Sequence, residues 1–203
     1  MVIIALALAL PALMGAEART LPVAPLYAIQ SDVEIDAPPE RVWKTVIAFA
    51  DIPPPTEWAF RIGVAYPTSA RITGEGPGAI RECIFSTGTF VEPIEVWDAP
   101  RRLAFRVTHN PPPMNEWTPY ANVHPPHLKD FLVSEAGQFE LQETRDGRTR
   151  LVGTTWYRHN LWPAAYWRLW SDWLIHKIHL RVLHHIRALN EANAAPSAAR
   201  GEP

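Results

Sequence analysis

Several features that would assign a function directly are absent from the sequence. It has one cysteine, Cys83, among 203 residues, which excludes an intrachain disulfide. Its formal net charge of −2 gives no electrostatic reason to expect a nucleic-acid partner. It also lacks a P-loop, a GxSxG nucleophile pattern, and the HExxH and CxxC spacings of metal sites. We therefore expect neither a cofactor nor a metal, and no catalytic motif identifies a reaction.

Proline and apolar residues, by contrast, are plentiful. The 21 prolines include clusters at residues 53–55, 111–113 and 125–126, which indicate stiffened loops around a rigid scaffold. Hydrophobic residues make up 47% of the chain and charged residues 20%, which is typical of a globular protein. A chain of 203 residues favours one domain with a sizeable core.

The N-terminal segment is apolar and stands apart from the rest. Residues 2–14 carry no charge, and Ala-x-Ala, ending at Ala18, follows them. Residues 1–20 are therefore a signal peptide, the end of a transmembrane segment, or the product of a misassigned start. The first interpretation is weakened because no Lys or Arg precedes the apolar run. We expect the protein to be membrane-associated or exported, on an undetermined side, with residues 21–30 as a linker.

The first part of the domain, predicted at 31–193, reads as a strand and a helix. Residues 31–36 alternate between apolar and polar, as in a half-buried strand. A helix is expected to start at Pro38-Pro39 and to stop before Pro53, with a short second helix at 57–60. Six strand-like segments follow, at 61–73, 79–86, 89–97, 102–108, 137–144 and 149–158. Turn residues between them predict antiparallel hairpins.

A long helix is predicted at residues 162–189. After Pro163 this segment contains no Gly or Pro, and its apolar residues recur at helical spacing. This stripe comprises Ala164, Trp167, Ser171, Leu174, Ile175, Ile178, Val182, Ile186 and Leu189. The element order predicts an α+β fold in which an antiparallel sheet bends around this helix. Residues 194–203 are expected to form a disordered tail.

Three stretches carry a resemblance to a known family. They are VEIDAPPERVWKTV (33–46), GEGPGAIRE (74–82) and EPIEVWDAPRRLAFRV (92–107). Together with the terminal helix, they resemble the START-like or SRPBCC superfamily, which includes polyketide cyclases and dehydratases and lipid-transfer domains. The resemblance implies a helix-grip fold, in which a curved sheet of about seven strands surrounds the C-terminal helix and an apolar cavity lies between them. The superfamily has no universal catalytic residues, so none is assigned here.

One segment departs from a minimal member of that superfamily. Residues 110–137 are too long for a hairpin turn and carry several aromatic residues and histidines. Long loops with their own apolar residues are commonly lids or packed loops. We expect this insertion to fold over one mouth of the cavity, with Tyr120 among the residues facing a ligand.

Five further residues are candidates for the cavity wall. Tyr157 faces inward if Leu151 does, since both lie on one face of a strand. His179 lies near the core stripe of the helix. His176 lies about 60° from His179 on the helical wheel and is not near that stripe. Glu92 can meet Glu82 across a hairpin, and it is an acid/base candidate if it points into the cavity; otherwise it faces solvent or pairs with an arginine. Trp167 on the helix stripe and Phe105 on an alternating strand complete the set.

The sequence predicts binding of a small hydrophobic or lipid-like ligand in the cavity. One alternative is a cyclase- or dehydratase-like enzyme that uses polar groups in the cavity, and another is a ligand-free interaction module of a membrane protein. The helix also has a second apolar face, formed by Tyr166, Leu169, Trp173 and Leu180. That face is expected to pack under the insertion or the N-terminal linker, or to contact a membrane surface or a protein partner.

Overall fold

A computed structural model of the protein describes residues 2–20, 23–115 and 131–192. The helices are α1 (Val2–Thr20), α2 (Pro39–Ile47), α3 (Trp58–Arg61) and α4 (Ala164–Ala192). The strands are β1 (Tyr27–Ile35), β2 (Pro67–Thr73), β3 (Ile80–Phe85), β4 (Gly88–Asp98), β5 (Arg102–Arg106), β6 (Leu132–Glu143) and β7 (Thr149–His159). The centre of the predicted insertion and the tail expected at 194–203 lie outside the described residues.

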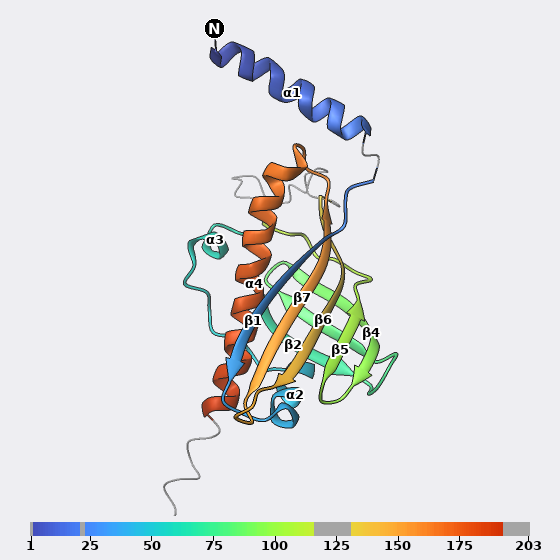
Figure 1. The fold of residues 1–203 in the computed structure, drawn as a ribbon, viewed down its shortest axis with the longest axis vertical. Coiled ribbons are helices and arrows are strands. Elements are labelled where there is room, and N and C mark those ends of the chain that lie inside the picture. Colours follow the sequence, from blue (N-terminus) through green and yellow to red (C-terminus); the bar gives the residue numbers. More distant parts are fainter. Residues whose placement is uncertain (1, 21–22, 116–130, 193–203) are drawn as a thin grey trace, which may run out of the picture.

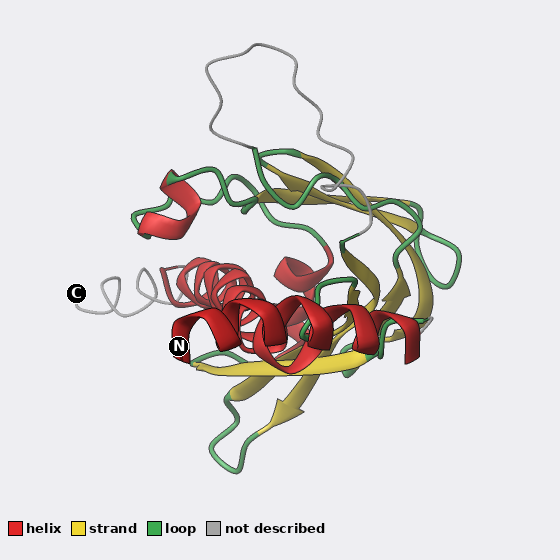
Figure 2. Ribbon diagram, turned by 90° about the horizontal axis from the view of Figure 1, so that it is seen from above, coloured by secondary structure: helices red, strands yellow, loops and turns green. Residues whose placement is uncertain are grey.

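The strands form one antiparallel sheet in the order β1-β7-β6-β5-β4-β3-β2. Strands β2 to β7 follow one another as a meander, and β1 joins the free edge of β7 (Figure 1). Seen from the end, the sheet curls around α4 (Figure 2). The predicted α+β helix-grip fold of seven antiparallel strands around a C-terminal helix is confirmed.

Strand β1 is longer than the sequence indicated. Residues 27–30 were expected in a linker, yet Tyr27 pairs with Tyr157 and Gln30 with Thr154. Only from Ser31 onward does every second residue become fully buried. None of the first four residues is fully buried, so they carry no clear strand pattern in the sequence. They are held in the strand by backbone pairing with β7, which is distant in sequence.

The predicted insertion is shorter than expected at its C-terminal end. Strand β6 already begins at Leu132, and a bulge between Ser134 and Ala136 interrupts its alternation. At the other end, the Asn110 amide accepts a hydrogen bond from Ser134 N and donates one to Ser134 O, at 2.9 and 3.1 Å. Residues 110–115 are therefore held against the sheet. The residues that would form the lid, including Tyr120, lie outside the described part.

Helix α4 lies along the concave face of the sheet and also contacts α2. Ala164, Ser171, Ile175, Val182 and Ile186 from the predicted stripe are buried. Leu183 and Asn190 are buried as well, although the helical wheel did not include them. The Asn190 side chain donates hydrogen bonds to Thr45 Oγ1 and to Ile186 O, which connects the end of α4 to α2.

The core is most tightly filled where α2 meets the sheet and the last turns of α4. Six apolar side chains there have no measurable exposure: Ile35, Val42, Val46, Leu103, Leu151 and Ile186. Pro39 fits the first turn of α2, because the backbone N–H that proline lacks has no partner at that position in any helix. Among the described residues, no helix combines the length and hydropathy needed to cross a bilayer.

Candidate functional site: a cavity between the sheet and helix α4

A cavity of about 130 Å³ separates the middle of α4 from the concave face of the sheet. Its wall is mostly apolar and aromatic, as in small-molecule sites generally. The apolar lining includes Phe85, Phe90, Phe105, Val107, Leu174 and Ile178. Polar groups on the wall come from Arg81 and Glu92 on one side and from Thr155 and His179 on the other.

Three of the six predicted site residues line this cavity. They are Phe105, Glu92 and His179. Tyr157 and Trp167 are not on its wall, and Tyr120 lies outside the described residues. The helix stripe nevertheless contributes to the cavity through Leu174, Ile175, Ile178 and Val182.

A glycine fixes the position of Phe105 on the cavity wall. The Phe105 ring lies across Gly137 on the neighbouring strand β6, and a Cβ atom at Gly137 would come within 2.6 Å of that ring. Any larger residue at this position would push the ring away. Gly137 thus allows Phe105 to lie flat between the sheet and the cavity.

A buried ion pair lies beside Phe105. Arg81 on β3 donates to the Glu92 carboxylate on β4, and their side chains are only 2% and 8% exposed. The Arg81 guanidinium lies 5.5 Å from the ring centroids of Phe105 and Phe139, and 5.9 Å from that of Phe49. Aromatic faces attract a cation, so the rings help to compensate for the water that Arg81 has lost. Arg81 Nε has no hydrogen-bond partner among the described residues.

The shifted pKa values of this cluster follow from its burial. Burial raises the pKa of the Glu92 carboxyl, although the adjacent Arg81 opposes the shift. Burial is the largest single influence on the pKa of Arg81 and lowers it. The charges and hydrogen bonds of Glu92 and Cys83 together exceed that effect, so the pKa of Arg81 is raised. Burial raises the pKa of the Cys83 thiol to about 12, and the Glu92 charge adds to this effect. The thiol is therefore protonated at neutral pH and is a poor nucleophile.

Of the two kinds of partner considered for Glu92, the structure shows an arginine, Arg81, and not the next residue, Glu82. The hairpin closes with Phe85 opposite Gly88, so Glu92 faces Arg81, and Glu82 faces Val91. Glu82 lies on the other face and pairs with the exposed Arg71 at 2.9 Å. A shift of one residue exchanges the two faces of a strand, which explains why two glutamates seemed able to meet. The two-residue turn at 86–87 was the signal that would have given the correct register.

His179 belongs to a hydrogen-bonded group that joins α4 to the sheet. Its Nε2 lies 2.8 Å from Thr155 Oγ1 on β7, and its Nδ1 lies 3.1 Å from Ser31 Oγ on β1. Ser31 Oγ also lies 2.7 Å from His176 Nδ1, so both histidines contact β1, although of the two only His179 lines the cavity. Burial, followed by the nearby His176, lowers the pKa of His179 to about 4. The imidazole is thus neutral at neutral pH, with both ring nitrogens engaged.

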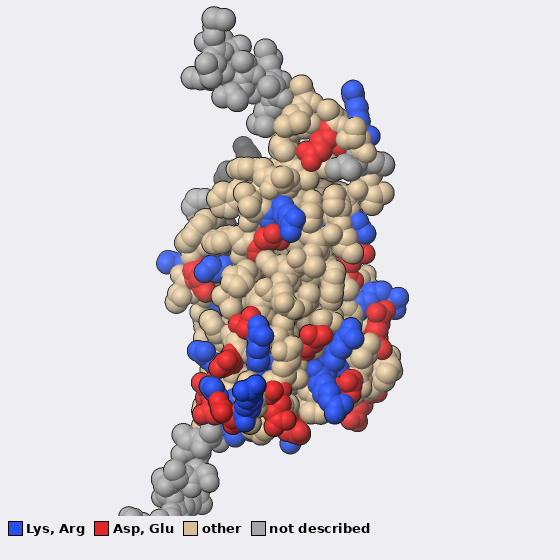
Figure 3. All heavy atoms as spheres, viewed as in Figure 1, with Lys and Arg blue, Asp and Glu red and all other residues tan. Residues whose placement is uncertain are grey.

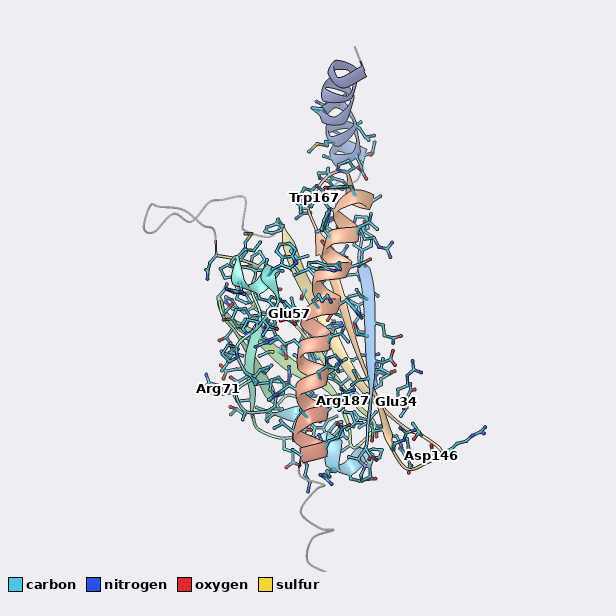
Figure 4. All side chains as sticks on the ribbon, turned by 90° about the vertical axis from the view of Figure 1, so that its left-hand side faces the viewer. Glu34, Glu57, Arg71, Asp146, Trp167 and Arg187 are labelled. Atoms are coloured by element: carbon cyan, nitrogen blue, oxygen red, sulfur yellow. The ribbon has the colours of Figure 1, made fainter. Side chains whose placement is uncertain are left out.

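Tyr157 joins β7 to α4 and lies apart from the cavity. It is fully buried, and its hydroxyl donates to Asp172 Oδ1 on α4 at 2.6 Å. Burial and this carboxylate raise the pKa of Tyr157. Asp172 also accepts a hydrogen bond from Arg168 at 3.3 Å. Trp167 lies near the N-terminal end of α4, with Tyr166 against its ring (Figure 4).

Metal ligation has no support in the described part of the chain, where no three His, Cys, Asp or Glu side chains are placed to share an ion. His124 and His127 lie outside that part.

The arrangement of strands, helix and cavity is shared with proteins of known structure. The Zhui aromatase/cyclase from a Streptomyces species superposes with a TM-score of 0.57 at 17% identity, over 86% of this chain and 99% of that one. Norcoclaurine synthase from Thalictrum flavum, as a point mutant with a transition-state analogue, gives 0.53 at 11% identity, over 85% and 99%. A Nitrosospira multiformis protein gives 0.51 at 16% identity, over 83% and 99%. The protein has the START-like, or SRPBCC, fold.

A comparison of the sequence with family models agrees with this fold. Residues 28–126, just under half of the chain, match the model of a family described as "Polyketide cyclase / dehydrase and lipid transport". No curated protein sequence matches the chain significantly. The structural likenesses described here are below 25% identity and establish the fold, so the chemistry of this protein has to be argued from its own cavity.

Proposed function

We propose that this SRPBCC-type protein binds a small neutral molecule with an apolar ring and an acceptor oxygen. The observation that carries the proposal is Arg81, a buried cation on the wall of an apolar cavity, whose Nε donor has no partner in the described part of the chain. An enclosed donor without an acceptor costs free energy. A ligand oxygen that reaches this wall would remove that cost, while the ring of the ligand replaces the empty space.

The size of the cavity limits the ligand. An apolar cavity of about 150 Å³ in another protein is known to hold benzene, and the present cavity has about 130 Å³. The enclosed part of the ligand is therefore about the size of one ring. This narrows the expected range of hydrophobic or lipid-like ligands to molecules whose buried part is compact, with any further part extending outside the cavity.

The charge of the cluster favours a neutral ligand. Arg81 and Glu92 together carry no net charge, and both are buried. A carboxylate ligand would add a negative charge next to Glu92 that no described cation balances inside the cavity. Burying an unpaired charge is expensive, so a ketone or phenol oxygen suits this wall better than a carboxylate.

The polar groups on the wall favour binding over catalysis. Glu92 is paired with Arg81, both nitrogens of His179 are hydrogen-bonded, and the Cys83 thiol is protonated. A general base must present a free lone pair to the proton that it removes. Glu92 Oε2 and both His179 nitrogens are already engaged, and the thiol is protonated, so none of these atoms is a free base in this arrangement. We therefore place the cyclase- or dehydratase-like alternative second.

Ligand-detected NMR on the full chain tests the proposal with three molecules of one shape. Acetophenone supplies a neutral oxygen, ethylbenzene supplies none, and benzoate supplies a charged one. We expect acetophenone to bind about tenfold more tightly than ethylbenzene, because a hydrogen bond to a charged donor is among the stronger ones. Benzoate is expected to bind most weakly.

Arg81→Lys is the matched variant, because lysine keeps the charge and loses the Nε donor. The preference for acetophenone over ethylbenzene should shrink in this variant, while ethylbenzene binding stays similar. Arg71→Lys on the neighbouring strand serves as the control, since Arg71 is exposed and pairs outside the cavity. Absence of binding by all three molecules, or equal affinity of the wild type for acetophenone and ethylbenzene, would refute the proposal.

A further inference from the structure

The N-terminal half of α4 exposes large apolar side chains to solvent. Four of them, Tyr166, Leu169, Trp170 and Trp173, lie on one face of the helix at spacings of three and four residues. Trp58 of α3 stacks on Trp173, with ring centroids 6.0 Å apart. We call these five residues the aromatic patch. Their side chains are exposed to 71% at Leu169, 62% at Trp58, 52% at Tyr166, 51% at Trp170 and 37% at Trp173.

The aromatic patch differs from the second face that the sequence predicted. Leu180 was expected to belong to it, but this side chain is partly buried and packs against the core. Trp170 was not expected and is half exposed. The rings contact one another, with 6.5 Å between the centroids of Trp170 and Trp173 and between those of Trp170 and Tyr166. The exposed face is therefore confined to one end of α4.

Charge is distributed unevenly between the two ends of the molecule. Lys, Arg, Asp and Glu gather around the end where α2 and the last turns of α4 lie, and toward the opposite end only isolated charged groups remain on the face shown (Figure 3). Figure 4 shows the same division, with Glu34, Asp146 and Arg187 at the charged end and Trp167 at the other. At the charged end, Arg148 pairs with Glu34 and Asp146, and Arg187 pairs with Glu191.

Helix α1 is attached at the end of the molecule opposite to this charged end (Figure 1 and Figure 3). The Glu17 carboxylate accepts a hydrogen bond from Ala164 N, with oxygens 3.2 and 3.3 Å away, at the first residue of α4. A carboxylate is favoured at this position because helix N-termini carry partial positive charge. Leu13 and Met14 of α1 are exposed close to this contact. Two apolar segments that are far apart in sequence thus meet at one end of the fold.

We infer that the aromatic patch and α1 rest together on the surface of a lipid bilayer. Trp and Tyr have amphipathic rings that favour the headgroup level of a membrane. Lys177 lies one turn after Trp173 and lines a pocket together with Trp58 and Trp173. It can reach lipid phosphates while its stem remains in the apolar layer. A bilayer explains why the apolar surface, the charge-free sequence of residues 2–14 and a low density of charged side chains (Figure 3) coincide at one end. This inference does not depend on which ligand the cavity binds.

Vesicle co-sedimentation of the full chain tests the inference. The vesicles are phosphatidylcholine alone, and phosphatidylcholine with 30% phosphatidylglycerol. We expect the double variant Leu169→Ser/Trp170→Ser to bind at least tenfold more weakly than the wild type, because each side chain removes apolar area from the bilayer. Trp170→Phe should also reduce the quenching of tryptophan fluorescence by brominated lipids.

Two controls separate the patch from general effects. Ile80→Ser removes an exposed apolar side chain on β3, outside the aromatic patch, and should change vesicle binding less than twofold. Leu13→Asp in α1 should weaken binding while leaving the aromatic patch intact. An unchanged melting curve confirms that the double variant is folded.

Three results would overturn the inference. The first is that the wild type fails to bind either kind of vesicle, and the second is that the double variant binds as well as the wild type. The third is a concentration-dependent dimer of the wild type, seen by analytical ultracentrifugation without lipid, that the double variant abolishes. In that case a second copy of the chain covers the aromatic patch.

Discussion

The two ends of the space between the sheet and α4 are filled in different ways. Near α2, aliphatic side chains from the sheet and from α4 occupy the space between the two layers. Leu103, Leu151 and Ile186 are fully buried there. Toward the N-terminal half of α4, the same two layers enclose a cavity. The sheet and helix continue through both ends, so the difference arises from the side chains and from α2.

This difference shows where the fold is less stable because it contains a cavity. A well-packed core gains dispersion and hydrophobic free energy from every contact, and an empty cavity forgoes both. The hollow end also holds a buried ion pair, which costs more desolvation than an apolar pair of similar size. Substitutions at matched positions in the two ends should therefore have unequal effects.

Removal of Arg81 should have the largest effect. Arg81→Met leaves the Glu92 carboxylate buried without a cation, and we expect the free energy of unfolding at pH 8 to fall by about 3–5 kcal/mol. The pKa of Glu92, already raised by burial, rises further in the variant. Because a proton then binds the folded state more tightly than the unfolded state, stability should recover as the pH falls toward 5.

Urea denaturation at pH 8 and pH 5 measures both effects. Arg71→Met is the control, because Arg71 and Glu82 form an exposed pair on the same two strands, and its loss should cost less than about 1 kcal/mol. The double variant Arg81→Met/Glu92→Met should regain most of the loss. An Arg81→Met protein as stable as the wild type at pH 8 would show that the ion pair is not buried.

Two isoleucines on α4 test the comparison directly. Ile186 is fully buried at the filled end, whereas Ile178 lines the cavity two turns earlier. Ile186→Ala should lower the free energy of unfolding by about 3 kcal/mol, because it creates a new void in packed surroundings. Ile178→Ala should cost about 1 kcal/mol, since this side chain already borders empty space. Equal losses in thermal or urea unfolding would mean that the cavity is filled in solution.

The pH dependence of His179 gives the smallest expected effect. Its pKa is about 4 in the folded protein, below the usual value near 6.5, because the ring is buried. A lowered pKa means that protonation favours unfolding, so its contribution is complete above pH 6.5 and is lost as the pH falls toward 4. The loss should be on the order of 2 kcal/mol.

Comparison of the wild type with His179→Asn isolates this contribution, since asparagine does not titrate. The variant should show a smaller decline in stability between pH 6.5 and 4. An NMR titration in which the His179 ring protonates near pH 6.5 would contradict the burial seen here.

Much of the fold was predictable from local patterns in the sequence. The alternation of residues 31–36 and the proline-initiated helices both depend on neighbours in the chain. The resemblance to SRPBCC proteins then gave the curvature of the sheet, and the structure confirms it. The first residues of β1 and β6 were missed because pairing with distant β7 orders them.

The site was less predictable, because its polar contacts join residues far apart in sequence. Arg81 was one arginine among several, and only the register of its hairpin shows that it meets Glu92. The contacts from Tyr157 to Asp172 and from His176 to Ser31 depend on how α4 docks. The volume of the cavity depends on all the side chains at once. Helical periodicity gave four residues of α4 that line the cavity, namely Leu174, Ile175, Ile178 and Val182.

The curled sheet remains open along one line, because β1 and β2 are its two edges and do not pair with each other. Helix α4 spans that gap with side chains alone. On one side His176 reaches Ser31 of β1, and on the other Arg181 donates to the carbonyl of Pro67 in β2 at 3.1 Å. Neighbouring strands are joined by ladders of backbone hydrogen bonds, whereas β1 and β2 are connected through side-chain contacts of α4. The spacing between the two sheet edges is therefore set by the position of α4 and not by backbone pairing.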